Sequence, residues 1–429
     1  MTDETPEQSD CGPRSDRSPD TARRRFLTAL GSSAALLAGC SGDGDSSSPG
    51  DAADATDSTD TAGAADSTDT AGATDPTDTI RSTATPVPTA TPMPDYHTAY
   101  VGTFTGEDSE GVYRCRVDGE TGGTELAGSV DPGENPSFLA LSPDGDRLYA
   151  VNEVDPGTVT AMAVDDSGAL SVLNTVENGG EGPAHVSIDA TGSYLLVSDY
   201  HGGVLSVIPV TDDGRLAEPS QVIDHGDGAN VHSVLPGPDN EVAYVAALGT
   251  DEFFVYDMDL EAGRLEEKQR IDVESGAGPR HADVHPDGSV VYVLCERNST
   301  LLAFDRSADG TLSQVASVDT LPPEFDGENY TAEVRVHQSG EFLYVSNRGY
   351  DSIARFDLQD PERPELVDQT DSGGEWPRHF TTGPDGDFLF VANQQSDDLH
   401  TFRIGGEGSL EPTGDVLGIP QPVCVVFAD

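Results

Sequence analysis

Short runs of alternating apolar and polar residues recur along the chain from residue 130 onward, with a period of about 46 to 52 residues. Repeats of about this length are typical of propellers and solenoids. The unit is clearest from Pro183 to Asp199, where an alternating run, a Thr-Gly turn and an apolar run follow one another. Further copies run from Pro136 to Asn152, from Pro279 onward, from Thr331 to Asn347, from Pro377 to Asn393 and, in a more divergent form, from Asn230 to Ala247.

Each unit predicts four short strands. The first strand alternates in character and ends in Pro-Asp-Gly or a similar turn, where glycine supplies a positive φ. An apolar strand such as Phe342 to Ser346 follows, then an alternating strand such as Ser352 to Leu358, a polar turn and a weaker fourth strand. No stretch of this region has a helical period. Four antiparallel strands in a repeat of this length indicate a propeller blade.

Six copies are complete, and the parts of a seventh lie at opposite ends of the repeat region. Pro420 to Phe427 matches only the opening strand of a unit, whereas Tyr96 to Gly102 matches a second strand. Pairing these two segments would close the ring and leave no open edge between blades. The sequence therefore predicts an all-β fold, a seven-bladed β-propeller over residues 96–429 with four antiparallel strands in each blade.

The residues before the propeller resemble export and spacer segments. Basic residues at Arg23 to Arg25 precede an apolar run that is shorter than the about 20 residues of a membrane span, which predicts a signal peptide over residues 1–40. The paired arginines resemble a twin-arginine export signal, and Leu37 to Cys40 resembles a lipobox with Cys40 as the lipidated residue. Residues 41–95 are almost all Ser, Thr, Asp, Ala, Gly and Pro, which predicts a disordered linker. We expect a protein on the extracellular face of the cell membrane, held there by its lipid anchor alone.

The net charge of the chain limits the classes of molecule that it can bind. It has 78 acidic and 22 basic residues and a formal net charge of −56. Such a surface repels nucleic acid, so we expect no nucleic-acid partner. The composition is typical of proteins that work in molar salt, where screening removes the self-repulsion, and with the export motifs it indicates a haloarchaeal source. We expect a monomer, as is common for propellers.

The cysteines do not predict a disulfide framework or a metal site. Cys11 and Cys40 precede the propeller, which leaves Cys115, Cys295 and Cys424. None of them has the spacing of a zinc site. We expect these three to be small buried strand residues, and we expect no cofactor.

Propeller geometry brings equivalent positions of the repeat together. The inner strand of each blade begins at one face of the channel, and the second strand ends at that face. The third position of the inner-strand unit reads, blade by blade, Phe138, His185, His232, His281, Glu333, His379 and Pro422. Four of the ten histidines of the chain fall in this column. A structural role needs no such mixture of ionisable groups, so we interpret the column as a candidate functional site.

Further polar residues are predicted at the same mouth of the channel. The neighbouring column contributes Arg280 and Arg378. The ends of the second strands contribute Asn152 and Glu153, Asp199 to His201, Glu296 and Arg297, Asn347 and Arg348, and Asn393 and Gln394. His285 and His337 fall beside the turn at the opposite end of the strand, where we expect a structural role.

These motifs resemble the lactonase family of seven-bladed propellers, which includes cycloisomerase-type 6-phosphogluconolactonases and carboxy-muconate lactonizing enzymes. The resemblance covers about residues 97–429 and includes the order of the motifs. It rests on Asn135 to Gly145, Gly278 to His281, Thr331 to Val336, Val345 to Gly349 and Trp376 to Phe380. It implies a cofactor-independent site that opens or closes a lactone with His, Glu and Arg side chains. The predicted export conflicts with a cytoplasmic sugar phosphate as substrate, but it does not conflict with this type of reaction.

Lactone hydrolysis needs a water, a base and a donor to the developing oxyanion. We assign His185 or His232 as the base and Glu333 as its orienter or an alternative base. Arg280 and Arg378 are assigned as anion and oxyanion binders, since a guanidinium holds a carboxylate or phosphate with two hydrogen bonds. The expected substrate is a small, sugar-derived lactone, and its further contacts are expected to be Glu153, His281, Arg348, His379 and Gln394.

Other interpretations stay open. The family includes lactonizing isomerases, so the direction of the reaction is undecided. Leu343 to Asn347 and Leu389 to Asn393 also resemble the repeats of archaeal surface propellers, which would bind a glycan or a protein without catalysis and need no column of His, Glu and Arg. A calcium-dependent lactonase is a further alternative, in which Asn152, Glu153, Asn347 and Asn393 would supply oxygen ligands.

Overall fold

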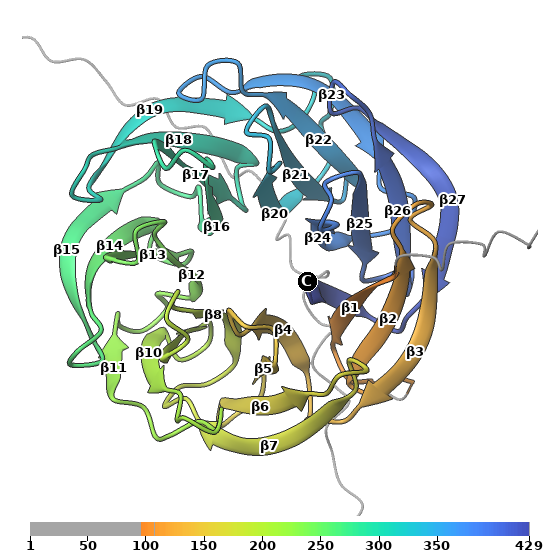
Figure 1. The fold of residues 1–429 in the computed structure, drawn as a ribbon. Coiled ribbons are helices and arrows are strands. Elements are labelled where there is room, and N and C mark those ends of the chain that lie inside the picture. The colour runs from red at the N-terminus through yellow and green to blue at the C-terminus, as the bar shows by residue number, and fades with distance from the viewer. Residues whose placement is uncertain (1–95, 107, 429) are drawn as a thin grey trace, which may run out of the picture. The chain divides into compact units, whose positions relative to one another are not determined.

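The computed structural model describes residues 96–106 and 108–428, which form a ring of seven four-stranded antiparallel sheets (Figure 1). Every regular element among these residues is a β-strand. The seven-bladed propeller predicted from the sequence is therefore confirmed. Within these residues no helix has the length and apolar character of a membrane span. The predicted signal peptide, Cys40 and the linker lie outside the described residues.

The strands fall into four sets by their distance from the axis of the ring (Figure 1). The inner strands are β4 (Pro136–Leu141), β8 (Pro183–Ile188), β12 (Val231–Pro236), β16 (Pro279–Val284), β20 (Tyr330–Val336), β24 (Pro377–Thr382) and β28 (Pro422–Ala428). The second strands are β1 (Tyr96–Thr103), β5 (Arg147–Asn152), β9 (Tyr194–Asp199), β13 (Val242–Ala247), β17 (Val290–Cys295), β21 (Phe342–Arg348) and β25 (Phe388–Asn393). The third strands are β2 (Val112–Asp118), β6 (Thr158–Val164), β10 (Val204–Pro209), β14 (Glu252–Asp259), β18 (Thr300–Arg306), β22 (Ser352–Asp357) and β26 (Asp398–Ile404). The outer strands are β3 (Thr124–Val130), β7 (Leu170–Glu177), β11 (Gln221–Asp224), β15 (Arg264–Asp272), β19 (Leu312–Asp319), β23 (Glu365–Asp371) and β27 (Leu410–Gly418).

The hydrophobic pattern of each strand follows from its place in the blade. All six residues of β13 and of β17 are buried, because a second strand packs against the neighbouring blades on both of its faces. Outer strands such as β15 and β27 instead present most of their residues to solvent. Continuous apolar runs therefore mark the second strands, and alternating polar runs mark the rim.

One blade is built from both ends of the propeller sequence. Its sheet has the order β28-β1-β2-β3, and β28 pairs antiparallel with β1 in the register Val425 to Val101 and Phe427 to Ala99. The closure predicted from the split repeat is confirmed. Val425 and Val101 are fully buried at this junction, so apolar packing and backbone hydrogen bonds both hold the ring shut.

Side chains also tie each blade to the next. The hydroxyls of Tyr100, Tyr292 and Tyr344 each donate to a backbone carbonyl of the following blade, at 2.8 Å to Gly168, Pro361 and Gly408 respectively. His285 Nε2 and His337 Nε2 lie 3.0 Å from the carbonyl oxygens of Gly340 and Gly386 in the following blades. The structural role predicted for both histidines is confirmed.

The three propeller cysteines, Cys115, Cys295 and Cys424, are buried strand residues and form no disulfide. Burial raises the pKa of each thiol to about 12, so the thiols stay protonated at neutral pH. This agrees with the packing role expected from the sequence.

Deleting residues 423–429 should open the ring and lower the melting temperature of the whole propeller. The deletion removes the buried Val423 and Val425, worth about 1.5–3 kcal/mol each, and exposes the hydrogen-bonding edge of β1. Circular dichroism melts of the full chain and the truncated chain, recorded in molar salt, measure the effect. An unchanged melting temperature would contradict closure by β28.

Candidate active site

A β-bulge near the start of the inner strands decides which residues converge. In β8, β16 and β24 the register shifts between the first and third residues, so the second residue is unpaired. In β12 the shift falls between Val231 and Ser233. The unit therefore begins at Val231, one residue later than the sequence frame assumed, and Ser233 takes the third position. His232 instead takes the unpaired second position, which Arg280 and Arg378 occupy in their own strands.

The closing blade needs a similar correction. Its third position was expected at Pro422, but Pro422 pairs with Thr103 and Cys424 pairs with Gly102. Pro422 is therefore equivalent to the prolines that begin the other inner strands, and Cys424 is the third residue. Pro420 and Pro422 both match the proline that begins the repeat unit. The sequence frame started at Pro420 and was therefore wrong by two residues.

Five side chains from five blades meet on the axis of the ring, and we call them the axial cluster. They are Phe138, His185, His281, Glu333 and His379. The rings of Phe138 and His185 pack with their centroids 4.2 Å apart, and the centroids of His185 and His281 are 5.4 Å apart. All five residues are buried, so the cluster fills the channel rather than lining an open pore.

Glu333 organises one side of the axial cluster. Its Oε2 lies 2.9 Å from His281 Nδ1 and 3.4 Å from His379 Nε2, and its Oε1 lies 3.2 Å from Arg335 Nε. We had expected Glu333 to orient His185 or His232, and this is wrong. The blades adjacent to that of Glu333 carry His281 and His379, whereas His185 and His232 belong to more distant blades.

The histidines of the axial cluster are neutral at neutral pH. Burial lowers the pKa of His185 and of His379 to about 3, although the carboxylate of Glu333 acts in the opposite direction. Burial, together with the charge of Arg280, also holds the pKa of His281 well below 6.5. The cost of removing an imidazolium from water outweighs the attraction of the one carboxylate.

A second group of charged residues lies beside the axial cluster, and we call it the mouth cluster. It comprises His232, Arg280, Glu296, Arg348 and Arg378. Glu296 Oε2 lies 3.0 Å from Arg280 Nε and 2.7 Å from Arg348 Nη2, so one carboxylate oxygen holds two guanidinium groups. Arg348 also donates to the carbonyl oxygen of Thr331 at 2.9 Å. The positions of these guanidinium groups are thereby set before any substrate arrives.

The mouth cluster is cationic within a strongly acidic protein. Burial alone would raise the pKa of Glu296, but Arg348 and Arg280 outweigh it and hold this pKa below its usual value. Burial and the charges of Arg348 and Arg378 lower the pKa of Arg280 to about 9, which still leaves the group protonated at neutral pH. Three guanidinium groups therefore face one carboxylate, and the excess positive charge suits an anion or a developing oxyanion.

Within the mouth cluster, His232 is the residue that borders the axial cluster. Its ring centroid is 5.1 Å from that of His281 and 5.7 Å from that of Tyr200. Burial, reinforced by the positive charge of Arg280, holds the pKa of His232 well below 6.5. Its Nδ1 is buried and has no hydrogen-bond partner among the described residues. The neutral imidazole with a free ring nitrogen is the form that can accept a proton from a water, and the positive charge of the neighbouring arginines opposes the imidazolium that would result.

A small pocket connects the clusters. Its walls are Ser137, Phe138, Ala184, Arg280, His281, Arg378, His379 and Val423. Its volume of about 10 Å³ is close to the minimum that holds one water molecule. The pocket therefore accommodates a water or a single oxygen atom, and a larger ligand would lie above it among the arginines.

Two aromatic residues that the sequence did not single out flank the arginines. Arg378 lies over the ring of Phe104 at 5.2 Å, and Arg348 lies over the ring of Trp376 at 5.5 Å. Both aromatics precede or follow a strand, outside the alternating pattern, so strand periodicity could not identify them. Glu296 was noted only as the end of a second strand, and its position sixteen residues after Arg280 was the available clue, since Pro279 pairs with Cys295.

The remaining predicted residues have separate environments. Glu153 accepts a hydrogen bond from Ser137 Oγ at 2.9 Å, beside the small pocket, and the side-chain oxygen of Gln394 is buried without a partner among the described residues. Thr160, in the same blade, donates to the side-chain oxygen of Asn152 at 2.8 Å, and Thr320, which follows the outer strand of the preceding blade, donates to that of Asn347 at 2.9 Å. Residues 96–106 and 108–428 contain no group of three or more His, Cys, Asp or Glu side chains placed to hold a metal ion. The calcium alternative, in which three of the four named ligands are asparagines, stays a prediction.

Comparisons with known proteins match the described propeller. A family profile with the description "Lactonase, 7-bladed beta-propeller" matches residues 98–427. A 6-phosphogluconolactonase from Bacillus subtilis (strain 168) is 33% identical over 341 residues, which cover 76% of this chain and 97% of the relative. A 6-phosphogluconolactonase from Formosa agariphila is 31% identical over 346 residues, which cover 76% of this chain and 96% of the relative.

Solved structures show the same similarity. The periplasmic gluconolactonase of Pseudomonas aeruginosa superposes with a TM-score of 0.73 at 30% identity, and the match covers 78% of this chain and 99% of that one. A protein from Lactobacillus plantarum superposes with a TM-score of 0.74 at 30% identity, covering 78% of this chain and 100% of that one. The similarity thus spans nearly the whole of each relative.

The axial cluster should make the propeller less stable in mild acid. The pKa of His185 and of His379 is about 3 in the folded protein, against an ordinary 6.5. The unfolded chain therefore binds more protons below pH 6.5, and each of the two rings should remove about 1.4 kcal/mol of unfolding free energy per pH unit between 6.5 and about 3. Denaturant unfolding at pH 6.5 and pH 5.5, at constant high salt, measures this slope.

A matched pair of variants isolates the effect. His185→Phe should reduce the loss between the two pH values by about 1 kcal/mol, because one buried titratable ring is gone and the unfolded imidazole is already half protonated at pH 6.5. His201→Phe, at an exposed position, should keep the wild-type slope. An identical slope in wild type and His185→Phe would show that this imidazole is not held neutral by burial.

Proposed function

Because this chain belongs to the lactonase family of seven-bladed β-propellers, we propose that it is a lactone hydrolase acting at the mouth cluster. The family match covers residues 98–427, and relatives about 30% identical are lactonases by name. The observation that carries the proposal is the bridge from Glu296 to Arg280 and Arg348 beside the neutral His232. It supports the proposal because oxyanion donors and a proton acceptor belong to the same cluster.

In the proposed reaction the lactone carbonyl oxygen lies against Arg280 and Arg378, above the small pocket. Water attacks the carbonyl carbon, and the electron pair of the C=O bond moves to the oxygen, where the guanidinium groups stabilise the negative charge. Glu296 positions Arg280 and Arg348 through its shared oxygen and remains ionised. Fixed donors of this kind stabilise the transition state without reorganising during the reaction.

Of the two histidines that the sequence left open, the geometry favours His232 as the base. His232 shares its strand position with Arg280 and Arg378, whereas the ring of His185 packs against Phe138 in the axial cluster. His232 takes a proton from the attacking water and returns it to the ring oxygen as the carbon–oxygen bond breaks. The product is a hydroxy acid, whose carboxylate the arginines hold until it leaves. Glu333 then acts indirectly. It holds His281 by a hydrogen bond, and the ring of His281 packs against that of His232.

The proposed substrate is an aldonolactone. Two of the relatives are named for 6-phosphogluconolactone hydrolysis and one for gluconolactone hydrolysis. A lactone rich in hydroxyl groups suits the polar rim, where Glu153 and Gln394 offer acceptors. The excess positive charge of the mouth cluster would also hold a phosphate, and Arg378 is the proposed contact because Glu296 engages only the other two arginines.

The proposed site of action is the extracellular face of the cell membrane. The twin-arginine and lipobox motifs in residues 1–40 support this location, as does the periplasmic location in the name of one similar enzyme. Outside the cell the available aldonolactone would be a free sugar lactone, so we propose the non-phosphorylated form as the substrate. The protein would work as a monomer in high salt.

Purified full-length protein should hydrolyse glucono-1,5-lactone in molar salt, in a pH-stat assay that includes 6-phosphogluconolactone and an aliphatic lactone. Arg280→Gln should lower kcat by about 10²–10³-fold, since it removes a donor to the oxyanion. His232→Gln should lower kcat by about 10²–10⁴-fold. Arg378→Ala should mainly raise KM, and more for the phosphorylated lactone.

Controls separate chemistry from folding. Arg297→Gln changes an exposed arginine next to Glu296 in sequence and should keep wild-type turnover. His185→Gln should reduce turnover far less than His232→Gln does. Prolonged chelation should leave the rate unchanged. Wild-type turnover in His232→Gln would overturn the assignment of the base, and no hydrolysis of any lactone would favour the surface-binding alternative.

A further inference from the structure

A repeated contact between blades is missing at one position. Five second strands carry a tyrosine at the same register, and these are Tyr100, Tyr149, Tyr244, Tyr292 and Tyr344. The hydroxyl donates to a backbone carbonyl of the following blade in every case except Tyr149. The Tyr149 hydroxyl has no hydrogen bond to any residue that the structure describes, although only 1% of this residue is exposed.

The following blade has an altered connection at this point. Its outer strand β11 has only four residues, and the chain before it makes an isolated bridge between Val210 and Leu216. Gly214, in this turn, packs against Arg147, because a Cβ built on Gly214 would come within 2.0 Å of Arg147 Nε. The turn therefore meets the side chain of Arg147, and Tyr149 is left without its usual carbonyl partner.

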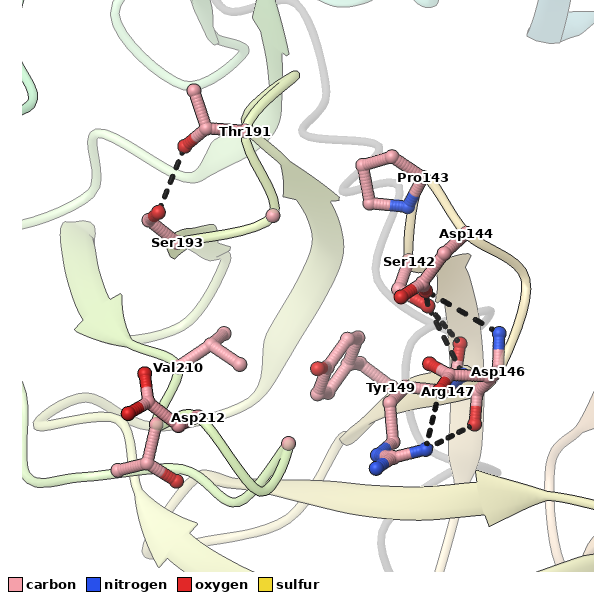
Figure 2. A pocket seen from close by; sticks show the side chains of 13 residues that line it. Ser142, Pro143, Asp144, Asp146, Arg147, Tyr149, Thr191, Ser193, Val210 and Asp212 are labelled. Atoms are coloured by element: carbon pink, nitrogen blue, oxygen red, sulfur yellow. Dashed lines mark hydrogen bonds and ion pairs between the residues drawn. The ribbon is translucent and has the colours of Figure 1, made fainter.

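A polar cleft of about 370 Å³ opens in front of Tyr149, between the blade of strands β4 to β7 and the blade of strands β8 to β11 (Figure 2). This volume is in the range of small-molecule binding sites. The cleft lies at the turns between inner and second strands, at the opposite end of the inner strands from the mouth cluster. Figure 2 shows the ring of Tyr149 directed from β5 toward Val210 and Asp212 across the cleft.

One donor faces this cleft without a protein partner, the hydroxyl of Tyr149, whose residue is almost wholly buried. Arg147 Nε is also unpaired among the described residues, but it is covered by Gly214 and does not reach the cleft. Polar groups of buried side chains are nearly always hydrogen-bonded in native proteins, since an unpaired donor carries a desolvation cost. The Tyr149 hydroxyl therefore indicates a ligand that accepts a hydrogen bond there.

The rest of the lining defines the class of ligand. It offers the hydroxyls of Ser142, Thr191, Ser193 and Thr211 and the carboxylates of Asp144, Asp146 and Asp212. Arg147 is the one cationic side chain of the lining, and its Nη1 already pairs with Asp146 Oδ2 at 3.1 Å. Three carboxylates against one guanidinium give a negative site, which repels phosphates and carboxylates. A ligand here must both donate to carboxylates and accept from Tyr149 while remaining uncharged.

We propose that this cleft is a second binding site, which takes a neutral monosaccharide or the terminal sugar of a glycan. Sugar hydroxyls are both donors and acceptors, so one ring can satisfy Tyr149 together with the aspartates. The site is separate from the mouth cluster in residues and in charge, and it does not depend on the proposed hydrolysis. A glycan bound in this cleft would lie at the opposite end of the inner strands from the mouth cluster and would leave that cluster open to solvent.

Binding of methyl glycosides of glucose, galactose and mannose to the full-length protein tests the proposal, by titration calorimetry in high salt. At least one glycoside should bind, and Tyr149→Phe should weaken its binding about 2- to 10-fold, the value of one hydrogen bond. Tyr344→Phe is the matched control, because its hydroxyl donates to Gly408 at 2.8 Å and does not face the cleft. It should bind as the wild type does, and so should Arg280→Gln.

Thermal melts of the same variants give a readout that needs no sugar. Tyr344→Phe should lower the melting temperature, whereas Tyr149→Phe should not, because its hydroxyl has no protein partner to lose. Equal losses in both variants would overturn the proposal. It would also be overturned if no glycoside bound, if Tyr149→Phe bound as tightly as the wild type, or if glucose 6-phosphate bound in preference to the neutral glycosides and Tyr149→Phe weakened that binding.

Discussion

Burial of every blade on both faces is the constraint on which this structure depends. A second strand such as β17 is buried along its whole length, so no blade is a stable sheet without a neighbour on each side. Seven blades meet this requirement only when the ring is closed, and the pairing of β28 with β1 closes it. The last strand of the chain thus completes the core of the first blade, and the integrity of the channel follows from that one junction.

The closed ring forces inner-strand side chains onto a shared axis, where water is scarce. In that environment the imidazoles of His185, His281 and His379 stay neutral, and Glu333 holds two of them by direct contact. The axial cluster therefore blocks the channel and forms the floor of a bowl. Next to the axial cluster the local charge is positive, because Arg280 and Arg348 share the one carboxylate of Glu296. The rest of the protein is acidic. This excess positive charge suits an anion at this end of the axis.

The repeat pattern contained most of the architecture. Apolar second strands, alternating outer strands and Pro-Asp-Gly turns follow directly from a blade buried on both faces, so their spacing predicted the fold. The split seventh repeat likewise predicted the closing blade, because Tyr96 to Gly102 lacks an inner strand that Pro420 to Phe427 supplies. The convergence of Arg280, His281, Glu333, Arg378 and His379 was predictable for the same reason, since equivalent positions of a closed repeat must meet.

The contacts within the site depend on single-residue register and on which blades are adjacent, and the repeat pattern does not specify these. The unit in β12 begins one residue later than the repeat indicated, so His232 lies beside Arg280 and not in the axial cluster, because neighbouring residues of a strand point in different directions. The partners of Glu333 depend on which blades are adjacent, and the role of Glu296 depends on the reach of two arginines from two strands. The missing carbonyl partner of the Tyr149 hydroxyl results from the altered turn in the following blade. The sequence by itself determined the fold, the closure and the set of residues that converge. Only the tertiary structure decided which of them touch, because hydrogen bonds and charge pairing act over distances shorter than one residue of register.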